Sequence, residues 1–330
     1  MKTITQNAYG APQQVLLTEE VPMPSPGEGE VLVRVRASSV NTPDWLAALG
    51  VPYVLRLATG VRAPSVKVRG SDVAGVVAAV GAQVTGFAPG DEVFGSTWTG
   101  ELGGVQRGAF AEYVVVPADQ LALKPKGLTF EEAAAAVMSG VTALQALRDV
   151  AQMRAGQRVL INGASGGVGL FAVQLAKALG AEVTGVCSTR NVELVRSVGA
   201  DHVIDYTQTN YADGDARYDV VMDNVLNHAP STSARVLAPG GVLLLNSIGD
   251  PAWLGSLPTM AYAALFKAKQ WRTTQFKPSR ENLEALRALL ESGAVRVVID
   301  SVYPLEAAGQ AVAHMASRRA RGKVVLTTAG

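Results

Sequence analysis

The spacing of apolar and polar residues predicts β-structure in the first third of the chain. Residues 31–37 alternate apolar and charged side chains, which is typical of a half-buried strand. Two further short β runs follow at residues 73–80 and 111–116, with turn signals such as Pro89-Gly90-Asp91 between the runs. Short strands at close spacing predict a small, rolled, antiparallel domain.

The pattern changes near Thr129, where strands begin to alternate with helices. Thr129 followed by Glu132 forms a capping-box pattern that predicts the start of a long helix. Beyond it we expect strands at 158–162, 182–187, 202–204, 219–222 and 242–246, with helices at 167–179 and 191–198. This alternation predicts an α/β unit of the Rossmann type, a doubly wound parallel sheet covered by helices.

The end of the chain returns to the pattern of the beginning. A predicted helix at 281–292 precedes β runs at 297–302 and 323–327. The simplest interpretation is a discontinuous domain that the tail completes. We therefore expect one mainly antiparallel domain from residues 1–128 and 278–330, and a dinucleotide-binding domain from residues 129–277.

Composition narrows the classes of protein to consider. The chain has 330 residues, with 29 Lys+Arg against 28 Asp+Glu, so charge gives no reason to expect nucleic acid as a partner. The single cysteine, Cys187, cannot form an internal disulfide or a cysteine zinc site, which favours a reduced, cytoplasmic protein. The apolar run 251–266 contains two prolines and falls short of the ~20 residues that span a bilayer. No stable membrane insertion is expected.

The clearest motif is a glycine-rich loop between a predicted strand and a predicted helix. Against the pattern G-x-G-x-x-G the match is Ala164, Gly166 and Gly169. Gly166 lets a pyrophosphate approach the backbone, Gly169 lets the helix pack on the strand, and the helix N-terminus attracts phosphate. A tight structural turn is the alternative interpretation. The predicted cofactor contacts in this loop are Ser165, Gly166, Gly167 and Val168.

The end of the next predicted strand bears on which dinucleotide binds. NAD sites place an acid there for the ribose 2′-hydroxyl, whereas NADP sites supply a cation for the 2′-phosphate. Residues 186–191 contain no acid, and Ser188 and Thr189 precede Arg190. Because arginine forms strong bonds with phosphate, the sequence favours NADPH (NADP), bound by Ser188 and Arg190. The alternative for Arg190 is a solvated residue at the start of a helix.

Seven motifs follow one another along the chain, at residues 31–44, 70–75, 89–93, 139–142, 162–169, 199–206 and 322–326. In these motifs and their order, the chain resembles the medium-chain dehydrogenase/reductase superfamily over nearly its whole length, and most closely its zinc-free quinone-oxidoreductase branch. It implies a GroES-like fold for the antiparallel domain and a homodimer.

The resemblance also implies a reaction without metal. In zinc-dependent members three catalytic ligands stand at positions that correspond to Asn41, Ser71 and Met138, and none of these is a useful zinc ligand. Members without zinc reduce electron-poor small molecules, such as quinones, enals, enones and some enoyl thioesters. The protein then needs mainly to hold the nicotinamide against the acceptor carbon.

Several further site residues follow from the resemblance. Asn41 is expected beside the nicotinamide ribose and the acceptor, and Tyr53 is a candidate donor to the acceptor oxygen. The alternatives are an asparagine that caps its own turn and an aromatic side chain that lines the cleft. Further candidate cofactor contacts are Thr142, Tyr206, Lys323 and the backbone of Ser247 and Ile248. Thr142 has the alternative of bonding to its own helix, and Lys323 that of a surface lysine.

One loop departs from the family pattern. Where the family often has an Asp-Ala-Val-Gly turn, this chain has Asp223-Asn224-Val225-Leu226. Leucine in place of glycine restricts the backbone, so the cofactor contacts of this loop are in doubt. Three functions remain open: an NADPH-dependent reductase of quinones or activated alkenes, a metal-free alcohol or carbonyl dehydrogenase, and an NADPH-binding sensor or structural protein with little turnover.

Overall fold

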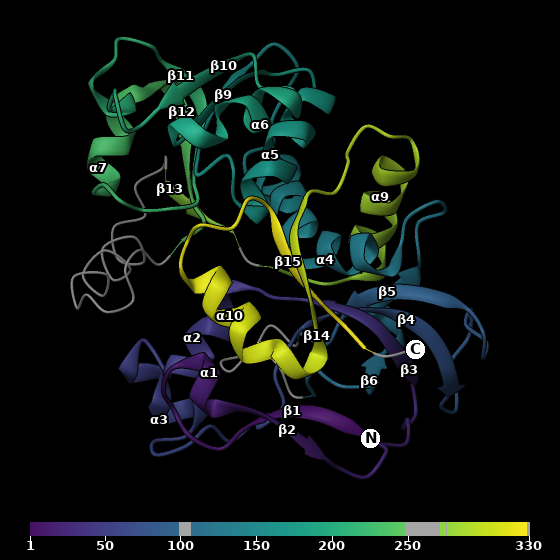
Figure 1. Cartoon of the computed structure of the whole chain (residues 1–330). Helices are drawn as coiled ribbons and strands as arrows, with labels where there is room; N and C mark the ends of the chain where they lie inside the picture. Colours follow the sequence, from purple (N-terminus) through teal and green to yellow (C-terminus); the bar gives the residue numbers. More distant parts are fainter. Residues whose placement is uncertain (99–106, 248–270, 275, 329–330) are drawn as a thin grey trace. The chain divides into compact units, whose positions relative to one another are not determined.

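The computed structural model describes residues 1–98, 107–247, 271–274 and 276–328, which form two compact units (Figure 1). The first unit consists of Met1–Val141, Lys277–Glu291 and Val297–Gly330, and the second consists of Thr142–Phe276 and Ser292–Arg296. In the described part of the chain, no helix is both long and apolar enough to cross a membrane.

The second unit is built on a six-stranded sheet with the order β10-β9-β8-β11-β12-β13, in which every neighbouring pair is parallel. This confirms the predicted doubly wound sheet. Its strands are β8 (Arg158–Asn162), β9 (Glu182–Cys187), β10 (His202–Asp205), β11 (Tyr218–Asp223), β12 (Leu237–Leu245) and β13 (Trp271–Thr273). The described part of this unit also contains the helices α5 (Gly167–Ala178), α6 (Val192–Ser197) and α7 (Pro230–Ser233). The chain order reverses between β8 and β11, and open α/β sheets bind ligands beyond the carboxyl ends of strands at such a point.

Close packing explains the positions of the central strand β8 and of the helix α5 that follows it. Val159, Leu160 and Ile161 of β8 are completely buried, as expected for a strand covered on both faces. A Cβ added to Gly169 of α5 would lie 2.1 Å from the carbonyl oxygen of Gly163. The helix therefore approaches the strand closely because residue 169 has no side chain.

The first unit contains a seven-stranded, mainly antiparallel sheet with the order β14-β15-β3-β4-β5-β7, and β6 pairs with β3. The strands are β3 (Glu30–Ser39), β4 (Asp72–Val80), β5 (Glu92–Ser96), β6 (Tyr113–Pro117), β7 (Leu121–Leu123), β14 (Ile299–Pro304) and β15 (Lys323–Thr327). In register, Val325 of β15 lies opposite Ser39 of β3. The tail of the chain thus places Lys323 in the same sheet as the end of β3.

The first unit also contains elements that the sequence patterns did not predict. A hairpin forms from β1 (Lys2–Gln6) and β2 (Leu16–Glu20), and a helix, α10 (Ala308–Ala316), packs on α1 (Pro12–Val15) and α2 (Thr42–Leu49). Ile4, Val40, Leu305 and Val312 bring these elements into one apolar core. Other described helices are α3 (Arg56–Thr59), α9 (Arg280–Glu291) and α4 (Phe130–Gln145), of which α4 continues past Val141 into the second unit.

The predicted capping box at the start of α4 is confirmed. The Thr129 backbone N–H donates to Glu132 Oε2 at 2.9 Å, and the Glu132 backbone N–H donates to Thr129 Oγ1 at 3.2 Å. The predicted long helix ends in a single π-helical turn, Ala146–Val150. Short 3₁₀ turns occur at Tyr53–Leu55, Ala118–Gln120, Thr189–Asn191, Tyr211–Asp213, Ala234–Val236 and Leu305–Ala307.

Candidate functional site

The glycine-rich loop of the second unit has the geometry that a pyrophosphate requires. It joins the end of β8 to the start of α5, with Gly166 as the N-cap residue of that helix. A Cβ added to Gly166 would meet only the Gly163 carbonyl oxygen, at 3.5 Å, so glycine at this position leaves open space that the packing does not need. Together with the free N–H groups of the helix N-terminus, this space suits a phosphate group.

The structure brings the two predicted serine contacts together through a residue that the sequence analysis missed. Asn191 Nδ2 donates to Ser165 Oγ at 2.9 Å and to Ser188 Oγ at 3.3 Å. Asn191 is buried, and its Oδ1 has no hydrogen-bond partner. Asn191 stands at the start of the predicted helix, where asparagine is common as a cap, so no sequence signal distinguished it.

An acid does lie near the end of β9, because the last residue of the neighbouring strand β10 is Asp205, which pairs with Cys187. Asp205 accepts hydrogen bonds from the Thr189 and Thr207 hydroxyls at 2.6 and 2.7 Å, and from Gln208 Nε2 at 3.0 Å. These bonds, that from Thr189 above all, lower the pKa of the Asp205 carboxyl. Its oxygens are therefore engaged by its own neighbours. Tyr206, the next residue, is exposed and its backbone N–H donates to the Cys187 carbonyl.

The loop after β11, whose sequence departs from the family pattern, is stabilised by its own aspartate. Asp223 Oδ1 accepts from Asn162 Nδ2 at 2.9 Å and from the backbone N–H groups of Val225 and Leu226 at 3.0 and 2.8 Å. Leu226 has a φ of 57°, in the left-handed region that favours glycine. The turn thus keeps a glycine-like backbone despite the leucine. Ser247 Oγ donates to the Val225 carbonyl at 3.3 Å, whereas Ile248 lies outside the described residues.

In the first unit, Asn41, Asp72 and Lys323 form a buried polar network. Asn41 Nδ2 donates to Asp72 Oδ2 at 2.8 Å, and Asn41 Oδ1 accepts from Lys323 Nζ at 2.5 Å. Lys323 Nζ also donates to the Val40 carbonyl at 3.1 Å, and Asn41 Nδ2 lies 3.4 Å from Ser71 Oγ. The alternative of a surface lysine is therefore wrong, because Lys323 is only 4% exposed.

Burial dominates the electrostatics of this network. It raises the pKa of the Asp72 carboxyl and lowers that of the Lys323 ammonium, while the attraction between the two charges opposes both shifts. The neighbouring Asp44 carboxyl accepts from the backbone N–H of Asn41 at 2.8 Å, and burial raises its pKa to about 6. Asn41 and Ser71, two of the three positions that correspond to zinc ligands, lie together here. The backbone of the third, Met138, bonds to Asp72.

Tyr53 and Thr142 occupy different surroundings. Tyr53 is 65% exposed, and the Arg56 guanidinium lies 4.8 Å from the centre of its ring. Arg56 in turn donates to the carbonyl oxygens of Gly50 and Leu49 at 2.8 and 2.9 Å, which ties this segment to the end of α2. Thr142 lies buried within α4.

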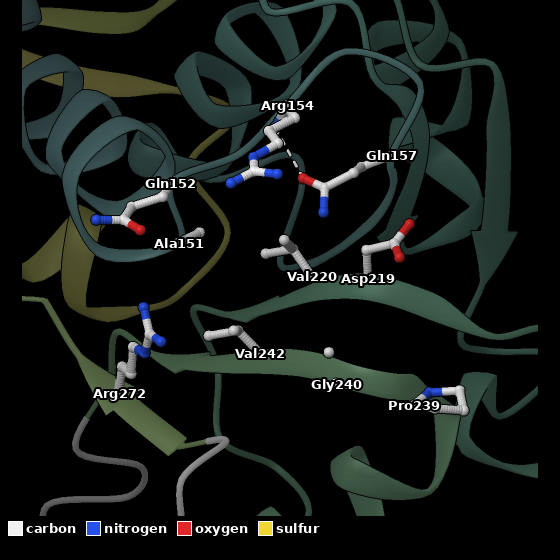
Figure 2. A pocket seen from close by; sticks show the side chains of 11 residues that line it. Ala151, Gln152, Arg154, Gln157, Asp219, Val220, Pro239, Gly240, Val242 and Arg272 are labelled. Carbon is white, nitrogen blue, oxygen red and sulfur yellow. Dashed lines mark hydrogen bonds between the residues drawn. The ribbon is translucent and has the colours of Figure 1, made fainter.

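A hollow in the second unit lies away from the glycine loop. It has a volume of about 340 Å³ and is lined by residues that include Gln152, Arg154, Asp219 and Arg272 (Figure 2). Asp219 and Val220 stand near the start of β11, at the edge of the sheet opposite to Asp223. Because ligands of such sheets bind at the carboxyl edge, this hollow is separate from the loop site. Within the described ranges, no three His, Cys, Asp or Glu residues gather to hold a metal ion.

Comparison with known proteins agrees with this arrangement. Residues 27–126 match the family model of the alcohol dehydrogenase GroES-like domain, and residues 198–326 match that of the zinc-binding dehydrogenases. The quinone oxidoreductase of Sus scrofa is 32% identical, over 99% of this chain and 97% of its own. The 2-methylene-furan-3-one reductase of Solanum lycopersicum is 34% identical, over 99% of this chain and 79% of its own.

Solved structures show the same fold over the full chain. The Escherichia coli quinone oxidoreductase complexed with NADPH superposes with a TM-score of 0.82 at 26% identity, covering 99% of this chain and 100% of that one. An NAD-dependent alcohol dehydrogenase gives a TM-score of 0.83 at 31% identity, covering all of both chains. On the strength of its full-length relatives, this chain belongs to the medium-chain dehydrogenase/reductase family, among the oxidoreductases of its quinone-oxidoreductase branch.

Proposed function

We propose that this chain is an NADPH-dependent reductase that passes a hydride to quinones or activated alkenes, such as enals and enones, without a metal. The observation that carries the proposal is the network of Asn41, Asp72 and Lys323. In it the amide of Asn41, at one of the positions that correspond to zinc ligands, accepts a hydrogen bond from the buried ammonium group of Lys323. An ammonium group repels a metal cation, and an amide that is bonded at both ends is a poor ligand.

Quinones and activated alkenes suit such a site. When bound, the cofactor supplies a hydride from nicotinamide C4. In these acceptors the negative charge moves to an oxygen away from the carbon that receives the hydride, so no Lewis acid is needed there. Tyr53 is our candidate donor to that oxygen, since its ring is held by Arg56 and it is exposed to an incoming molecule. Asn41 is our candidate for the residue that contacts the acceptor and the nicotinamide ribose.

The choice of NADPH rests on the second unit. Ser188 and Arg190 follow β9, and the acid that pairs with the end of this strand, Asp205, is engaged by Thr189, Thr207 and Gln208. The complex of the Escherichia coli relative with NADPH supports the same choice. We assign the remaining cofactor contacts to the glycine loop and to Thr142, Tyr206, Lys323, Ser247 and Ile248.

A metal-free alcohol or carbonyl dehydrogenase is the second candidate, favoured by the similarity to an NAD-dependent alcohol dehydrogenase. The two candidates differ in the bond that they reduce. We expect purified protein to oxidise NADPH with quinones, enals or enones, and to convert an enone to the saturated ketone, as identified by mass spectrometry. An allylic alcohol with its C=C bond intact would contradict the proposal. Tight NADPH binding without any oxidation across the panel would favour the sensor.

We propose further that the protein is a homodimer in the cytoplasm. Among the described strands, β13 is at the edge of the six-stranded sheet, and an edge strand can pair with a second copy of the chain. Cys187 is buried, and burial raises the pKa of its thiol to about 11, which keeps it unreactive in a reducing compartment. Light scattering and cell fractionation test the two statements. A monomer, or recovery of the protein in a secreted fraction, would contradict them.

A further inference from the structure

We infer that Asn191 is a positioning residue for cofactor choice, which turns the hydroxyl hydrogens of Ser165 and Ser188 toward the 2′-phosphate of NADPH. The inference rests on the proposed function and deepens it. It begins from the three-residue cluster of the second unit, in which one buried amide joins the glycine loop to the end of β9.

The hydrogen-bond chemistry of this cluster fixes both hydroxyl groups as donors. The Asn191 amide nitrogen carries two hydrogens, and it donates to Ser165 Oγ at 2.9 Å and to Ser188 Oγ at 3.3 Å. A hydroxyl oxygen that accepts in this way uses a lone pair and keeps its own hydrogen for another acceptor. Phosphate oxygens only accept hydrogen bonds, so two hydroxyl donors side by side match a phosphate.

The orientation of the amide follows from its surroundings. With the nitrogen facing the serines, the group left without a partner is the buried carbonyl oxygen Oδ1 of Asn191. In the opposite orientation a buried NH₂ group would lose partners for both of its hydrogens. Unpaired buried donors are costly and rarer in proteins than under-used carbonyl oxygens. The orientation that makes the serines donors is therefore the more stable one.

The hydroxyl group of Thr189 shows the arrangement that the Asn191 amide prevents at Ser188. This hydroxyl donates to Asp205 Oδ2 at 2.6 Å, so its hydrogen is already used within the protein. Ser188, one residue earlier, receives a hydrogen bond from Asn191 instead and keeps its own hydrogen. Of the two adjacent hydroxyls that follow β9, the one bonded to Asn191 is thus the donor available to a ligand.

A double-mutant cycle on cofactor binding tests this role. The dissociation constants for NADPH and for NADH are measured by fluorescence titration. We expect Asn191→Ala to raise the dissociation constant for NADPH about tenfold, in line with ~1.5 kcal/mol for a hydrogen bond to a charged group. The constant for NADH, which lacks the 2′-phosphate, should change less than about threefold. In the Ser165→Ala/Ser188→Ala background the same substitution should add nothing, because Asn191 acts through the two hydroxyls.

Two further variants complete the test. Asn191→Asp keeps the shape of the side chain but offers no hydrogens, so both serine hydroxyls should turn inward and donate to it. Binding of NADPH should then be lost. Binding of NADH shows that the variant is folded. Asn210→Ala is the matched control, since the Asn210 amide bonds only within its own turn, where Oδ1 accepts from the Ala212 backbone N–H and Nδ2 donates to Asp213. It should leave both constants unchanged.

The outcomes separate this inference from the function on which it rests. A wild-type preference for NADPH that survives Asn191→Ala, or an effect of Asn191→Ala that persists without the two serines, overturns the role of Asn191 alone. Equal wild-type affinities for NADPH and NADH overturn the choice of NADPH and, with it, the inference.

Discussion

Replacing Lys323 by methionine is expected to lower the free energy of unfolding by about 3 kcal/mol, because it leaves the Asp72 carboxylate buried without its cation. Asp72 is completely buried, and Lys323 reaches it through the Asn41 amide. Methionine fills a similar volume but offers no hydrogen to Asn41 Oδ1 or to the Val40 carbonyl. Urea unfolding measures the effect, and Lys67→Met, at an exposed lysine of the same unit, is the matched control.

The loss should also depend on pH. The pKa of Asp72 is raised in the folded state by burial, and Lys323 opposes that shift. Without Lys323 the folded pKa rises further, so the native state binds the proton more readily than the unfolded state and loses stability as pH rises. We therefore expect a larger loss at pH 8 than at pH 5, and a partial recovery in Lys323→Met/Asp72→Asn. A loss no greater than that of Lys67→Met would contradict a structural role for the network.

Two glycines of the same loop should respond in opposite ways to alanine. In Gly169→Ala the new Cβ would lie 2.1 Å from the Gly163 carbonyl oxygen and 2.8 Å from the backbone of Ala164. Because backbone must move, we expect a loss of about 3 kcal/mol in the free energy of unfolding. In Gly166→Ala the nearest neighbour is at 3.5 Å, so the free energy should change by less than about 1 kcal/mol.

Cofactor binding separates the two roles. The methyl group of Gly166→Ala occupies the space where we expect the pyrophosphate, so NADPH should bind at least about tenfold more weakly in a protein of normal stability. Calorimetric titration of NADPH and urea unfolding of both variants provide the comparison. If Gly166→Ala bound NADPH as tightly as the wild type, the loop would not be the pyrophosphate site.

Local patterns predicted the second unit well because its signals are contained in short segments. The bounds of β8 and β9 agree with the predictions, since apolar runs and the glycine motif mark them directly. The start of β12 was predicted at residue 242 but lies at Leu237. Pro239, Gly240 and Gly241 are typical of a turn, and the register shift between Tyr218 and Val220 of β11 accommodates them within the strand pair.

Contacts between distant segments account for what the sequence did not show. Lys323 and Asn41 are 282 residues apart, and their hydrogen bond exists because β15 pairs with β3. Asn191 gains its role from a nearby serine, Ser188, and from Ser165, which is 26 residues away in the glycine loop. The hairpin of β1 and β2 and the helix α10 were likewise missed, since Ile4 and Val312 bury themselves only once those elements pack together.

Transfer of deuterium from labelled NADPH to an enone tests the proposed reaction most directly. NADPH labelled at nicotinamide C4, in the 4R and 4S forms separately, is incubated with the protein and an enone, and the product is analysed by NMR. We predict that one of the two forms delivers deuterium to the β-carbon of the saturated ketone, with none at the carbonyl carbon. Deuterium on the carbinol carbon of an allylic alcohol, or no transfer from either form, would contradict the account.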